Sequence, residues 1–386
     1  MSLRKILGVT GIRSEYDIMS SVFQAIQQHP MLQLELIVTG AHLSKGYGNT
    51  IDEIKKDGFV IADQIESLIN GDNSSSRVKG LAIQLQGMIQ TVARTKPDIL
   101  LVLGDREEAM STALVGAYMN IPVAHICGGD RVVGNVDDQV RHAVTKLSHL
   151  HFASNEESYN RIIRMGEQPF RVFNTGNPGL DRLLHVEQLS SNELSNRLGF
   201  HFSEEEPILL LIQHVISTEI EESYFQMKQT LKAIERLGIK TILSYPNSDA
   251  GTHGLIEAIE EYEKLPNLYT AKNIPRVEFV NIMRRASCLV GNSSAGILEA
   301  PLLKLPVVNV GNRQKGRLHA ENVQFVNHDE EEIYQAIYKA VYDSAYREMV
   351  QHCKNPYGDG KASLRIAQIL ASEPLDDRLL IKDLTY

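Results

Sequence analysis

A chain of 386 residues, 43% hydrophobic and 23% charged, has the composition of a globular protein and the length of two ordinary domains. Its formal net charge of −9 argues against general affinity for nucleic acid or an anionic membrane. No apolar run approaches the roughly 18 residues of a membrane span, and the N-terminus has no extended apolar stretch before a cleavage site. We therefore expect a cytoplasmic protein that acts on neither nucleic acid nor membrane.

Short β-rich runs alternate with longer amphipathic stretches along the chain. The expected strands are, in order, 5–11, 34–40, 98–104, 121–127, 150–154, 171–176, 207–213, 240–245, 288–292 and 305–310. The expected helices include 15–28, 77–95, 107–119 and 218–236. Many of the strands are almost continuously apolar, as is typical of strands buried on both faces of a parallel sheet. The alternation predicts an α/β fold with doubly wound parallel sheets.

Ten or more strands and their helices exceed what one such sheet usually holds. The segment 176–206, from Gly-Asn-Pro-Gly to an acidic stretch, is the expected break. We therefore expect two Rossmann-like domains, 1–178 and 179–361, with a cleft between them. A C-terminal helix at about 362–386 is expected to pack back on the first domain.

Polar residues follow the expected strands directly, where ligands of open α/β sheets bind. These residues are Arg13, His42, Asp105, Arg106, Asp130, His214, Asn292, Ser293 and Ser294. Because carboxyl ends of parallel strands share one edge, these side chains are expected to converge on a ligand.

The motif GNSSAG at 291–296 leaves an apolar strand and enters a helical stretch. Free backbone N–H groups at such a junction favour an anion, so Ser293 and Ser294 are candidate diphosphate contacts. Glu299 is placed to accept hydrogen bonds from ribose hydroxyls. The alternative is simple capping of the helix by serine.

Two basic groups are further candidates for phosphate contact. Arg13 ends a strand, and its guanidinium suits bidentate binding of an anion. Arg317 lies in a loop with Arg313 and Lys315. A surface ion pair for Arg13 and a solvated loop for Arg317 are the alternatives.

Three carboxylates are candidates for acid/base chemistry. Asp105 ends a strand, Asp130 follows a Gly-Gly turn, and Asp137 precedes an apparent helix. Proton transfer at a sugar carbon requires carboxylates tuned by their surroundings, although a single Asp is as often a turn or helix-cap residue. His214 can donate to a departing phosphate or carry a proton, unless it is a hydrogen-bonded structural imidazole.

We expect no metal site and no cofactor. The three cysteines, Cys127, Cys288 and Cys353, are far apart and form no CxxC pair, so neither a disulfide framework nor a cysteine zinc site is indicated. No pair of histidines has the spacing of a convincing metal site.

In this order, these residues resemble the hydrolysing UDP-N-acetylglucosamine 2-epimerases, over nearly the whole chain. The motifs that carry the resemblance are VTGIRSEY (9–16), VTGAH (38–42), LGDREE (103–108), HICGGD (125–130), DDQVRHAVTKLSHLHF (137–152), GNPGLD (176–181), LIQHVISTE (211–219), GNSSAGILEAP (291–301), GNRQKGR (311–317) and NPYGDGKAS (355–363).

The resemblance implies the GT-B architecture and a reaction in two stages. Elimination first expels UDP across C1–C2 to give a 2-acetamidoglucal, and water then adds with inverted configuration at C2. The products are N-acetylmannosamine and UDP. The family also suggests a homodimer or a higher homo-oligomer.

The resemblance also implies roles for individual residues. Arg13, His214, Ser293 and Ser294 correspond to diphosphate contacts, Glu299 to the ribose ligand, Phe279 to packing on uracil, and Asp105, Asp130 and Asp137 to the acid/base group; His42 and Arg317 are further expected substrate contacts. Two departures stand out. Asp130 replaces an expected Glu and is one methylene shorter, and His214-Val215 replaces a His-Pro pair.

Several alternatives remain at this stage. The same reaction on a UDP-2,4-diacetamido-6-deoxy sugar fits these motifs, as does a non-hydrolysing 2-epimerase. A GT-B glycosyltransferase and a sugar-nucleotide-binding protein without turnover are the others. The first loop, GIRSEYDI at 11–18, favours the hydrolysing branch.

Overall fold

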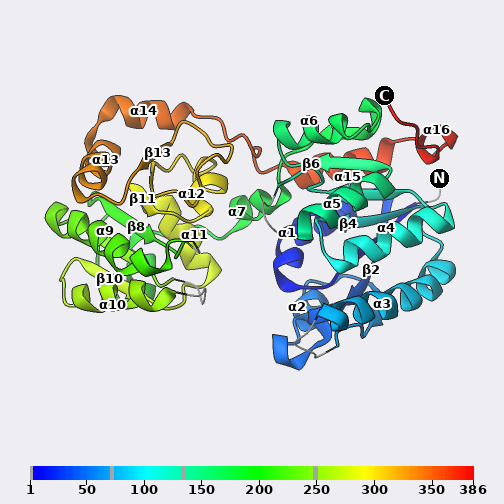
Figure 1. The fold of residues 1–386 in the computed structure, drawn as a ribbon, viewed down its shortest axis with the longest axis horizontal. Helices are drawn as coiled ribbons and strands as arrows, with labels where there is room; N and C mark the ends of the chain where they lie inside the picture. Colours follow the sequence, from blue (N-terminus) through cyan, green and yellow to red (C-terminus); the bar gives the residue numbers. More distant parts are fainter. Residues whose placement is uncertain (1–2, 70–73, 132–135, 217, 247–250) are drawn as a thin grey trace. The chain divides into compact units, whose positions relative to one another are not determined.

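The chain forms two compact units, each built around one parallel sheet (Figure 1). The structure is a computed structural model that describes residues 3–69, 74–131, 136–216, 218–246 and 251–386. Unit 1 comprises Met1–Leu184 and Tyr357–Tyr386, and unit 2 comprises His185–Pro356. Each unit is described below by itself.

Unit 1 contains a seven-stranded sheet in the order β3-β2-β1-β4-β5-β6-β7, with every pair of strands parallel. Its strands are β1 (Arg4–Thr10), β2 (Leu32–Thr39), β3 (Ile61–Ile65), β4 (Ile99–Leu103), β5 (Val123–Ile126), β6 (Leu150–Ala153) and β7 (Val172–Asn174). The central strands are buried throughout, as their continuous apolar sequences predict.

Helices cover both faces of this sheet (Figure 1). They are α1 (Arg13–Gln28), α2 (Ile51–Lys56), α3 (Ser74–Thr95), α4 (Glu107–Met119), α5 (Val136–Leu147), α6 (Glu156–Arg164), α7 (Asp181–His185), α15 (Ala362–Ser372) and α16 (Asp377–Leu380). One core layer includes Phe23 of α1, and the other includes Met88 of α3.

The C-terminal segment belongs to the core of unit 1. Ile366 and Leu370 of α15 are fully buried in the same cluster as Phe23 of α1. The buried guanidinium of Arg171 donates to the carbonyl of Leu379 at 2.9 Å. These contacts attach the last thirty residues to a sheet that the first half of the chain builds.

The boundaries between the units lie a few residues from the 178/179 and 361/362 divisions read from the sequence. The backbone N–H of Asn177 donates to the carbonyl of Tyr357 at 2.7 Å. The carboxylate of Asp181 accepts from the backbone N–H of Ala362 at 3.2 Å and of Ser363 at 2.6 Å. These bonds join the two segments of unit 1 just where the chain leaves it and returns.

Unit 2 contains a six-stranded parallel sheet in the order β10-β9-β8-β11-β12-β13. Its strands are β8 (Ile208–Ile212), β9 (Lys240–Ser244), β10 (Leu268–Ala271), β11 (Cys288–Gly291), β12 (Val307–Val310) and β13 (Val323–Val326). This order is that of a Rossmann sheet, in which the direction of winding reverses between the first strand and the fourth.

Among the residues that the structure describes, four helices of unit 2 fall between its strands, one precedes the first strand and two follow the last. They are α8 (Ser191–Leu198), α9 (Ser223–Leu237), α10 (Thr252–Tyr262), α11 (Arg276–Arg285), α12 (Ala295–Leu298), α13 (Glu330–Tyr342) and α14 (Ser344–His352). One hydrophobic cluster joins α9, α10 and α13 to the central strands and includes Leu231, Ile259 and Ile337. In the part of the chain that the structure describes, no helix is long and apolar enough to cross a membrane.

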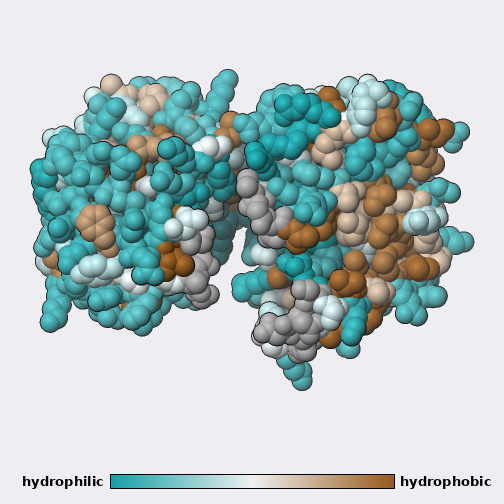
Figure 2. Space-filling model, viewed as in Figure 1, coloured by the Kyte–Doolittle hydropathy of each residue, from teal (hydrophilic) through white to brown (hydrophobic). Residues whose placement is uncertain are grey.

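The visible surface of unit 1 carries a gathering of hydrophobic side chains over α3 and α4 (Figure 2). Exposed large hydrophobic residues on these helices are Ile83 and Ile89 of α3 and Tyr118 of α4. Large exposed apolar patches on globular proteins often mark interaction surfaces.

Candidate functional site

The reversal of winding in unit 1 lies between the neighbouring strands β1 and β4. Ligands of open α/β sheets bind beyond the carboxyl ends of the strands at such a point. Arg13 begins α1 directly after the short loop that leaves β1, and the loops after β4 and β5 carry Asp105 and Asp130. Each side chain therefore follows a strand whose position the sheet determines.

Asp105 is a partly buried carboxylate with a cationic partner. Arg141 of α5 forms an ion pair with Asp105, and its other terminal nitrogen donates to the carbonyl of Cys127 at 3.0 Å. Burial raises the pKa of Asp105, the charge of Arg141 opposes this increase, and the nearby charge of Asp137 adds to it. A carboxyl with a raised pKa is suited to exchange a proton near neutral pH.

Asp137 lies in the first turn of α5, one turn before Arg141. The spacing of four residues places both side chains on one face of the helix. Asp137 also acts electrostatically on Arg77 of α3, so its carboxylate lies near both α3 and the end of β4. The first turn of a helix favours a negative charge.

Hydrogen bonds from the end of β6 and from α6 hold the side chain of Asp130. Its Oδ1 atom accepts hydrogen bonds from the hydroxyl of Ser154 and, at 2.6 Å, from that of Ser158. Arg161 of α6 donates to the carbonyl of the preceding Gly129. These bonds fix the turn and occupy one carboxylate oxygen, so Asp130 is a more restrained group than Asp105.

Two further carboxyls, Glu15 and Glu108, are buried behind the loop that follows β1, with exposed fractions of 3% and 4%. Glu15 Oε2 accepts from the backbone N–H of Gly11 at 3.0 Å, and Glu108 lies 3.5 Å from Arg106. Burial raises the pKa of both, well above the usual range for Glu15, where the charge of Glu108 adds to the effect. The sequence analysis did not select this pair.

Arg13 and His42 differ in what they offer a ligand. Arg13 is 64% exposed and pairs only loosely with Glu53 at 3.7 Å, so its guanidinium remains accessible. His42 is fully buried, and its ring nitrogens bond to Thr10 at 3.1 Å and Thr50 at 2.6 Å.

Burial also lowers the pKa of His42 to about 4, so the ring is neutral near pH 7. Both nitrogens are used within the protein. In the described structure the imidazole joins β1 to the segment before α2, and a contact of His42 with substrate stays a prediction. Ligand-binding residues also follow strands directly, so this position alone does not show that both nitrogens of His42 are bonded within the protein. Only the packing shows it.

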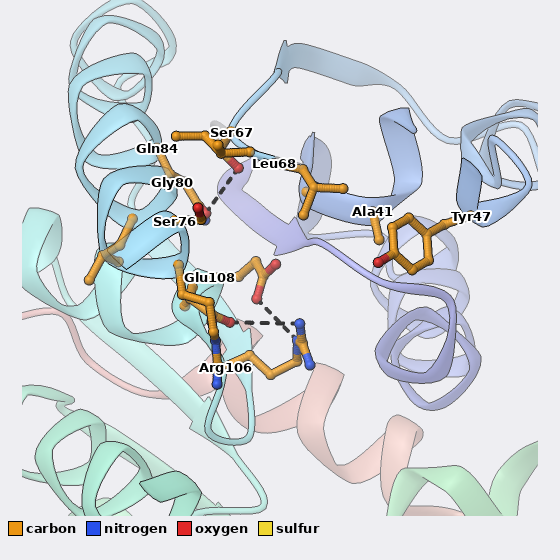
Figure 3. A pocket seen from close by; sticks show the side chains of 14 residues that line it. Ala41, Tyr47, Ser67, Leu68, Ser76, Gly80, Gln84, Arg106 and Glu108 are labelled. Atoms are coloured by element: carbon orange, nitrogen blue, oxygen red, sulfur yellow. Dashed lines mark hydrogen bonds and ion pairs between the residues drawn. The ribbon is translucent and has the colours of Figure 1, made fainter. Parts of the chain in front are cut away.

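A cavity of about 460 Å³ opens beside this edge of unit 1 (Figure 3). Its walls come from the segments after β2, β3 and β4 and from α3. Arg106 and Glu108 line one side, and Ser67 and Gln84 line another. The volume falls within the range of roughly 300–1,000 Å³ that is common for small-molecule sites.

The corresponding edge of unit 2 lies between β8 and β11, where Asn292 joins the two strand ends. Its Oδ1 accepts from the backbone N–H of His214 at 2.7 Å, and its Nδ2 donates to the carbonyl of His214 at 2.8 Å. The preceding Gly291 has a φ of +118°, and an added Cβ would lie 2.1 Å from the carbonyl oxygen of Ile212. The backbone here therefore requires glycine.

Ser293 and Ser294 follow directly, at the start of the short helix α12. Ser293 Oγ accepts from the backbone N–H of Ala295 at 3.3 Å, a local bond just before the helix, while the N-cap residue Ser294 makes no capping bond with its side chain among the described residues. Both residues are half-buried. Capping and ligand binding are compatible, because a hydroxyl that accepts one bond still has a proton to donate.

The loop after β12 packs on Asn292. Arg313 and Gln314 donate to the carbonyl of Asn292 at 3.1 and 2.9 Å, and the exposed Arg317 donates to Gln314 Oε1 at 2.9 Å. The basic loop predicted from the sequence is thus attached to the residue before the two serines through Arg313 and Gln314.

Glu299 follows α12 and pairs with Arg276, the first residue of α11, at 3.3 Å. Burial raises the pKa of Glu299, and the charge of Arg276 opposes this. Phe279 is half-buried and lies three residues after Arg276, on the same face of α11. The expected ribose and uracil ligands are therefore on neighbouring elements.

All three cysteines are buried and unpaired. Within the described ranges, no three His, Cys, Asp or Glu side chains are grouped so that they could hold a metal ion.

Each unit gathers part of the predicted set. Unit 1 holds Arg13, Asp105, Asp130 and Asp137, and unit 2 holds His214, Phe279, Ser293, Ser294, Glu299 and Arg317. Sequence reasoning missed Arg276, Gln84 and the Glu15/Glu108 pair. For the partner of Asp105, the only local pattern was the four-residue spacing between Asp137 and Arg141. The other contacts join segments that are far apart in the sequence, so no local pattern indicates them.

Comparison with known proteins identifies the family of the chain. The sequence profile of the family described as UDP-N-acetylglucosamine 2-epimerase matches residues 24–371. A UDP-N,N'-diacetylbacillosamine 2-epimerase (hydrolyzing) from Legionella pneumophila is 37% identical over 384 residues, 100% of both chains. A UDP-N-acetylglucosamine 2-epimerase from Neisseria meningitidis is 32% identical over 336 residues, 87% of both.

The fold is also shared with solved structures. The crystal structure of UDP-GlcNAc 2-epimerase from Neisseria meningitidis bound to UDP-GlcNAc superposes with a TM-score of 0.78 at 21% sequence identity, covering 95% of this chain and 99% of that one. This likeness confirms the predicted GT-B-like pair of parallel-sheet units. From the match of the family profile and of relatives along its full length, the chain belongs to the UDP-N-acetylglucosamine 2-epimerase family.

Proposed function

We propose that this protein is a hydrolysing 2-epimerase whose substrate is a UDP-2,4-diacetamido-6-deoxy sugar. The observation that carries the proposal is the 37% identity, over all of both chains, with a relative named for hydrolysing epimerisation of UDP-N,N'-diacetylbacillosamine. The sequence analysis had this substrate as an alternative and UDP-N-acetylglucosamine as the first expectation. The lower identity and coverage of the Neisseria relative favour the alternative.

In this proposal, unit 1 supplies the proton chemistry. Breaking of the C1–O bond runs ahead, because the C2 proton is only weakly acidic, and the electron pair of that bond leaves on UDP. The C2–H bond then breaks as its proton passes to a carboxylate, and its electron pair forms the C1–C2 double bond. Asp105, with its pKa raised by burial, and Asp137 beside it are the groups proposed for acid/base work. Asp130, restrained by two serine hydroxyls, is proposed as their third partner.

Unit 2 is proposed to hold the nucleotide. Ser293, Ser294 and Arg317 would contact the diphosphate, and Glu299 would accept bonds from the ribose hydroxyls. Phe279 would pack on the uracil ring. Donors held in place before the reaction stabilise negative charge as it develops on the departing UDP. His214, positioned through its own backbone by Asn292, and the exposed Arg13 are proposed to assist that departure.

The second stage adds water to the unsaturated sugar. A proton is delivered to C2 on the face opposite the one from which it was lost, and the water oxygen bonds to C1. The products are UDP and a free sugar epimerised at C2. No residue of this chain changes oxidation state, and no co-reactant besides water is consumed.

Proton NMR in D2O tests the proposal. The purified protein is incubated with the UDP-2,4-diacetamido-6-deoxy sugar and, separately, with UDP-N-acetylglucosamine. The expected result is release of UDP and of a free 2-epimerised sugar that carries deuterium at C2, faster with the diacetamido substrate. An epimerised sugar still attached to UDP, or no turnover of either substrate, would overturn the proposal.

UDP-N-acetylglucosamine is the second candidate, because the Neisseria relative that matches 87% of this chain is named for it. Faster release of N-acetylmannosamine in the same experiment would select this substrate. Release of UDP only when an acceptor sugar is added would select a glycosyltransferase instead.

We also propose that the protein is a homodimer or higher homo-oligomer. The exposed hydrophobic side chains over α3 and α4 are consistent with a second copy covering them (Figure 2). Light scattering of the purified protein tests this, and a monomer at micromolar concentration would contradict it.

A further inference from the structure

The cavity of unit 1 contains an amide whose bonding is incomplete. Gln84 of α3 lines this cavity and is only 1% exposed. The hydroxyl of Ser67 donates to Gln84 Oε1 at 3.5 Å, whereas Gln84 Nε2 has no hydrogen-bond partner among the described residues. A buried donor without an acceptor costs about 1–3 kcal/mol, so such a group is rarely retained unless something binds it.

Neighbouring residues hold this amide in position. Ser67 Oγ lies 2.9 Å from Thr39 Oγ1, and Thr39 donates to the carbonyl of Ile65 at 2.7 Å. These residues end β2 and β3, so the sheet itself determines where the amide of Gln84 lies. The side chain is thus a preorganised polar group rather than a mobile one.

The charges that line the cavity are balanced. Arg77 pairs with Glu107, and Arg106 lies within 3.7 Å of Glu107 and 3.5 Å of Glu108. Two cations facing two carboxyls give little net attraction for a phosphate. The cavity therefore fits an uncharged polar ligand, such as a hexose, better than the diphosphate.

Chain continuity places the cavity beside the acid/base group. Arg106, which lines it, directly follows Asp105, and their Cα atoms are about 3.8 Å apart. Gln84 lies on the side of the cavity away from Arg106 (Figure 3). A sugar whose C1–C2 bond faces Asp105 would present the opposite edge of its ring, C4–C5, to the far side of the cavity. The substituent at C4 would then face Gln84.

From these contacts we infer that the hexose of the substrate occupies this cavity and that Gln84 is a specificity-determining residue, which bonds the acetamido group at C4. The inference rests on the proposed function, because it takes the substrate to be a diacetamido sugar. An acetamido carbonyl accepts from Gln84 Nε2, and Leu68 and Leu81 of the cavity wall offer apolar surface for the acetyl methyl. UDP-N-acetylglucosamine has a hydroxyl at C4 and lacks that carbonyl.

The test compares Gln84→Met with wild type on both sugar nucleotides. Methionine has nearly the same length and removes the amide. We expect kcat/KM for the UDP-2,4-diacetamido-6-deoxy sugar to fall about tenfold, which corresponds to one buried neutral hydrogen bond. The value for UDP-N-acetylglucosamine should change less than about twofold, since no bond to C4 is lost there. Equal loss on both substrates, or no loss on either, would overturn the inference.

Two more variants complete the experiment. Gln86→Met changes an exposed glutamine two residues along the same helix and should leave both rates unchanged. Ser67→Ala removes the hydroxyl bonded to Gln84 and should give a smaller loss with the same selectivity. If Gln84→Met fails to fold, Ser67→Ala carries the comparison.

A binding measurement separates failure of this inference from failure of the proposed function. Saturation-transfer NMR with the free 2,4-diacetamido-6-deoxy sugar needs no turnover. Transfer to the 4-acetamido methyl should be present in wild type and weaker in Gln84→Met. Absence of turnover in wild type would reject the proposed function, whereas equal transfer in both proteins would reject the role of Gln84.

Discussion

The edges of the two sheets that carry candidate site residues differ in the kinds of side chain they contain. The edge of unit 1 is rich in buried titratable groups: Asp105 with its partner Arg141, and the carboxyls Glu15 and Glu108. The edge of unit 2 is organised by the neutral amide of Asn292, which bonds the backbone of His214. The same strand order near the point of reversal thus carries two different sets of side chains.

This difference suggests a separate role for each unit, which follows from the kinds of group that it buries. Burial of carboxyls shifts their pKa values upward, which suits proton transfer but costs stability. Neutral amides and backbone groups hold an anion without that cost. A change in unit 1 should therefore affect turnover or its pH dependence, and a change in unit 2 should affect nucleotide affinity.

The largest effect is expected from Asp105→Asn. The substitution removes a proposed acid/base carboxyl and leaves the side chain nearly the same size, so turnover should fall by about 10²–10⁴-fold. UDP affinity, measured by calorimetry, should change little, because the nucleotide is proposed to bind unit 2. Asp383→Asn, at an exposed carboxylate, is the control. Wild-type turnover in Asp105→Asn would remove this residue from the acid/base group.

Gly291→Ala should break the edge of unit 2. The φ of +118° and the 2.1 Å approach of an added Cβ to the carbonyl oxygen of Ile212 predict a loss of roughly 3 kcal/mol or more in stability. Gly199→Ala is the matched control, because its φ is +66° and nothing lies within 4 Å of an added Cβ. It should cost about 1–2 kcal/mol. Calorimetric unfolding distinguishes the two, and equal losses would contradict the close approach.

Glu299→Ala tests the nucleotide-binding role proposed for unit 2. Loss of the proposed bonds to ribose should weaken UDP about tenfold. Turnover at saturating substrate should change less than affinity, in contrast to Asp105→Asn. The control is Glu331→Ala, at an exposed carboxylate on α13 of the same unit. Unaltered affinity for UDP in Glu299→Ala would place the nucleotide elsewhere.

The smallest expected effect is on the stability of unit 1. Glu15 has a pKa raised well above its usual range, so the folded state binds its proton more tightly than the unfolded chain. The stability linked to this proton is complete below the unfolded pKa of about 4.3 and is lost as the pH rises through the folded value.

Glu15→Gln should therefore melt a few degrees higher than wild type at neutral and alkaline pH, and the difference should shrink toward about pH 4. Thermal unfolding across this pH range measures the effect. Glu66→Gln, at an exposed position, should show no such trend. A lower melting temperature for Glu15→Gln at every pH would indicate that the carboxylate stabilises the fold.

Most of the fold was predictable, because strands buried on both faces have continuous apolar sequences. The three strands that the analysis missed are β3 (Ile61–Ile65), β10 (Leu268–Ala271) and β13 (Val323–Val326). All three are edge strands. An edge strand has one neighbour and keeps polar residues, as in IADQI and VQFV, so its sequence lacks the apolar signal.

For the candidate site, the sequence pattern indicated which residues directly follow strands. It did not indicate which of these side chains are accessible to a ligand. His42 and Asp105 both follow a strand, yet His42 is bonded on both nitrogens inside the core and Asp105 is partly exposed. The difference comes from Thr10 and Thr50, which are distant from each other in sequence. Only folding brings both of them to one imidazole.

The sequence by itself determined the α/β class and the family, because these depend on local patterns and on motifs in order. The tertiary structure decided the environment of each side chain. It paired Arg141 with Asp105, buried Glu15 beside Glu108, and left the Nε2 atom of Gln84, in a cavity wall, without a hydrogen-bond partner among the described residues. Such properties depend on burial and on contacts between segments far apart in the chain, which no local pattern of residues contains.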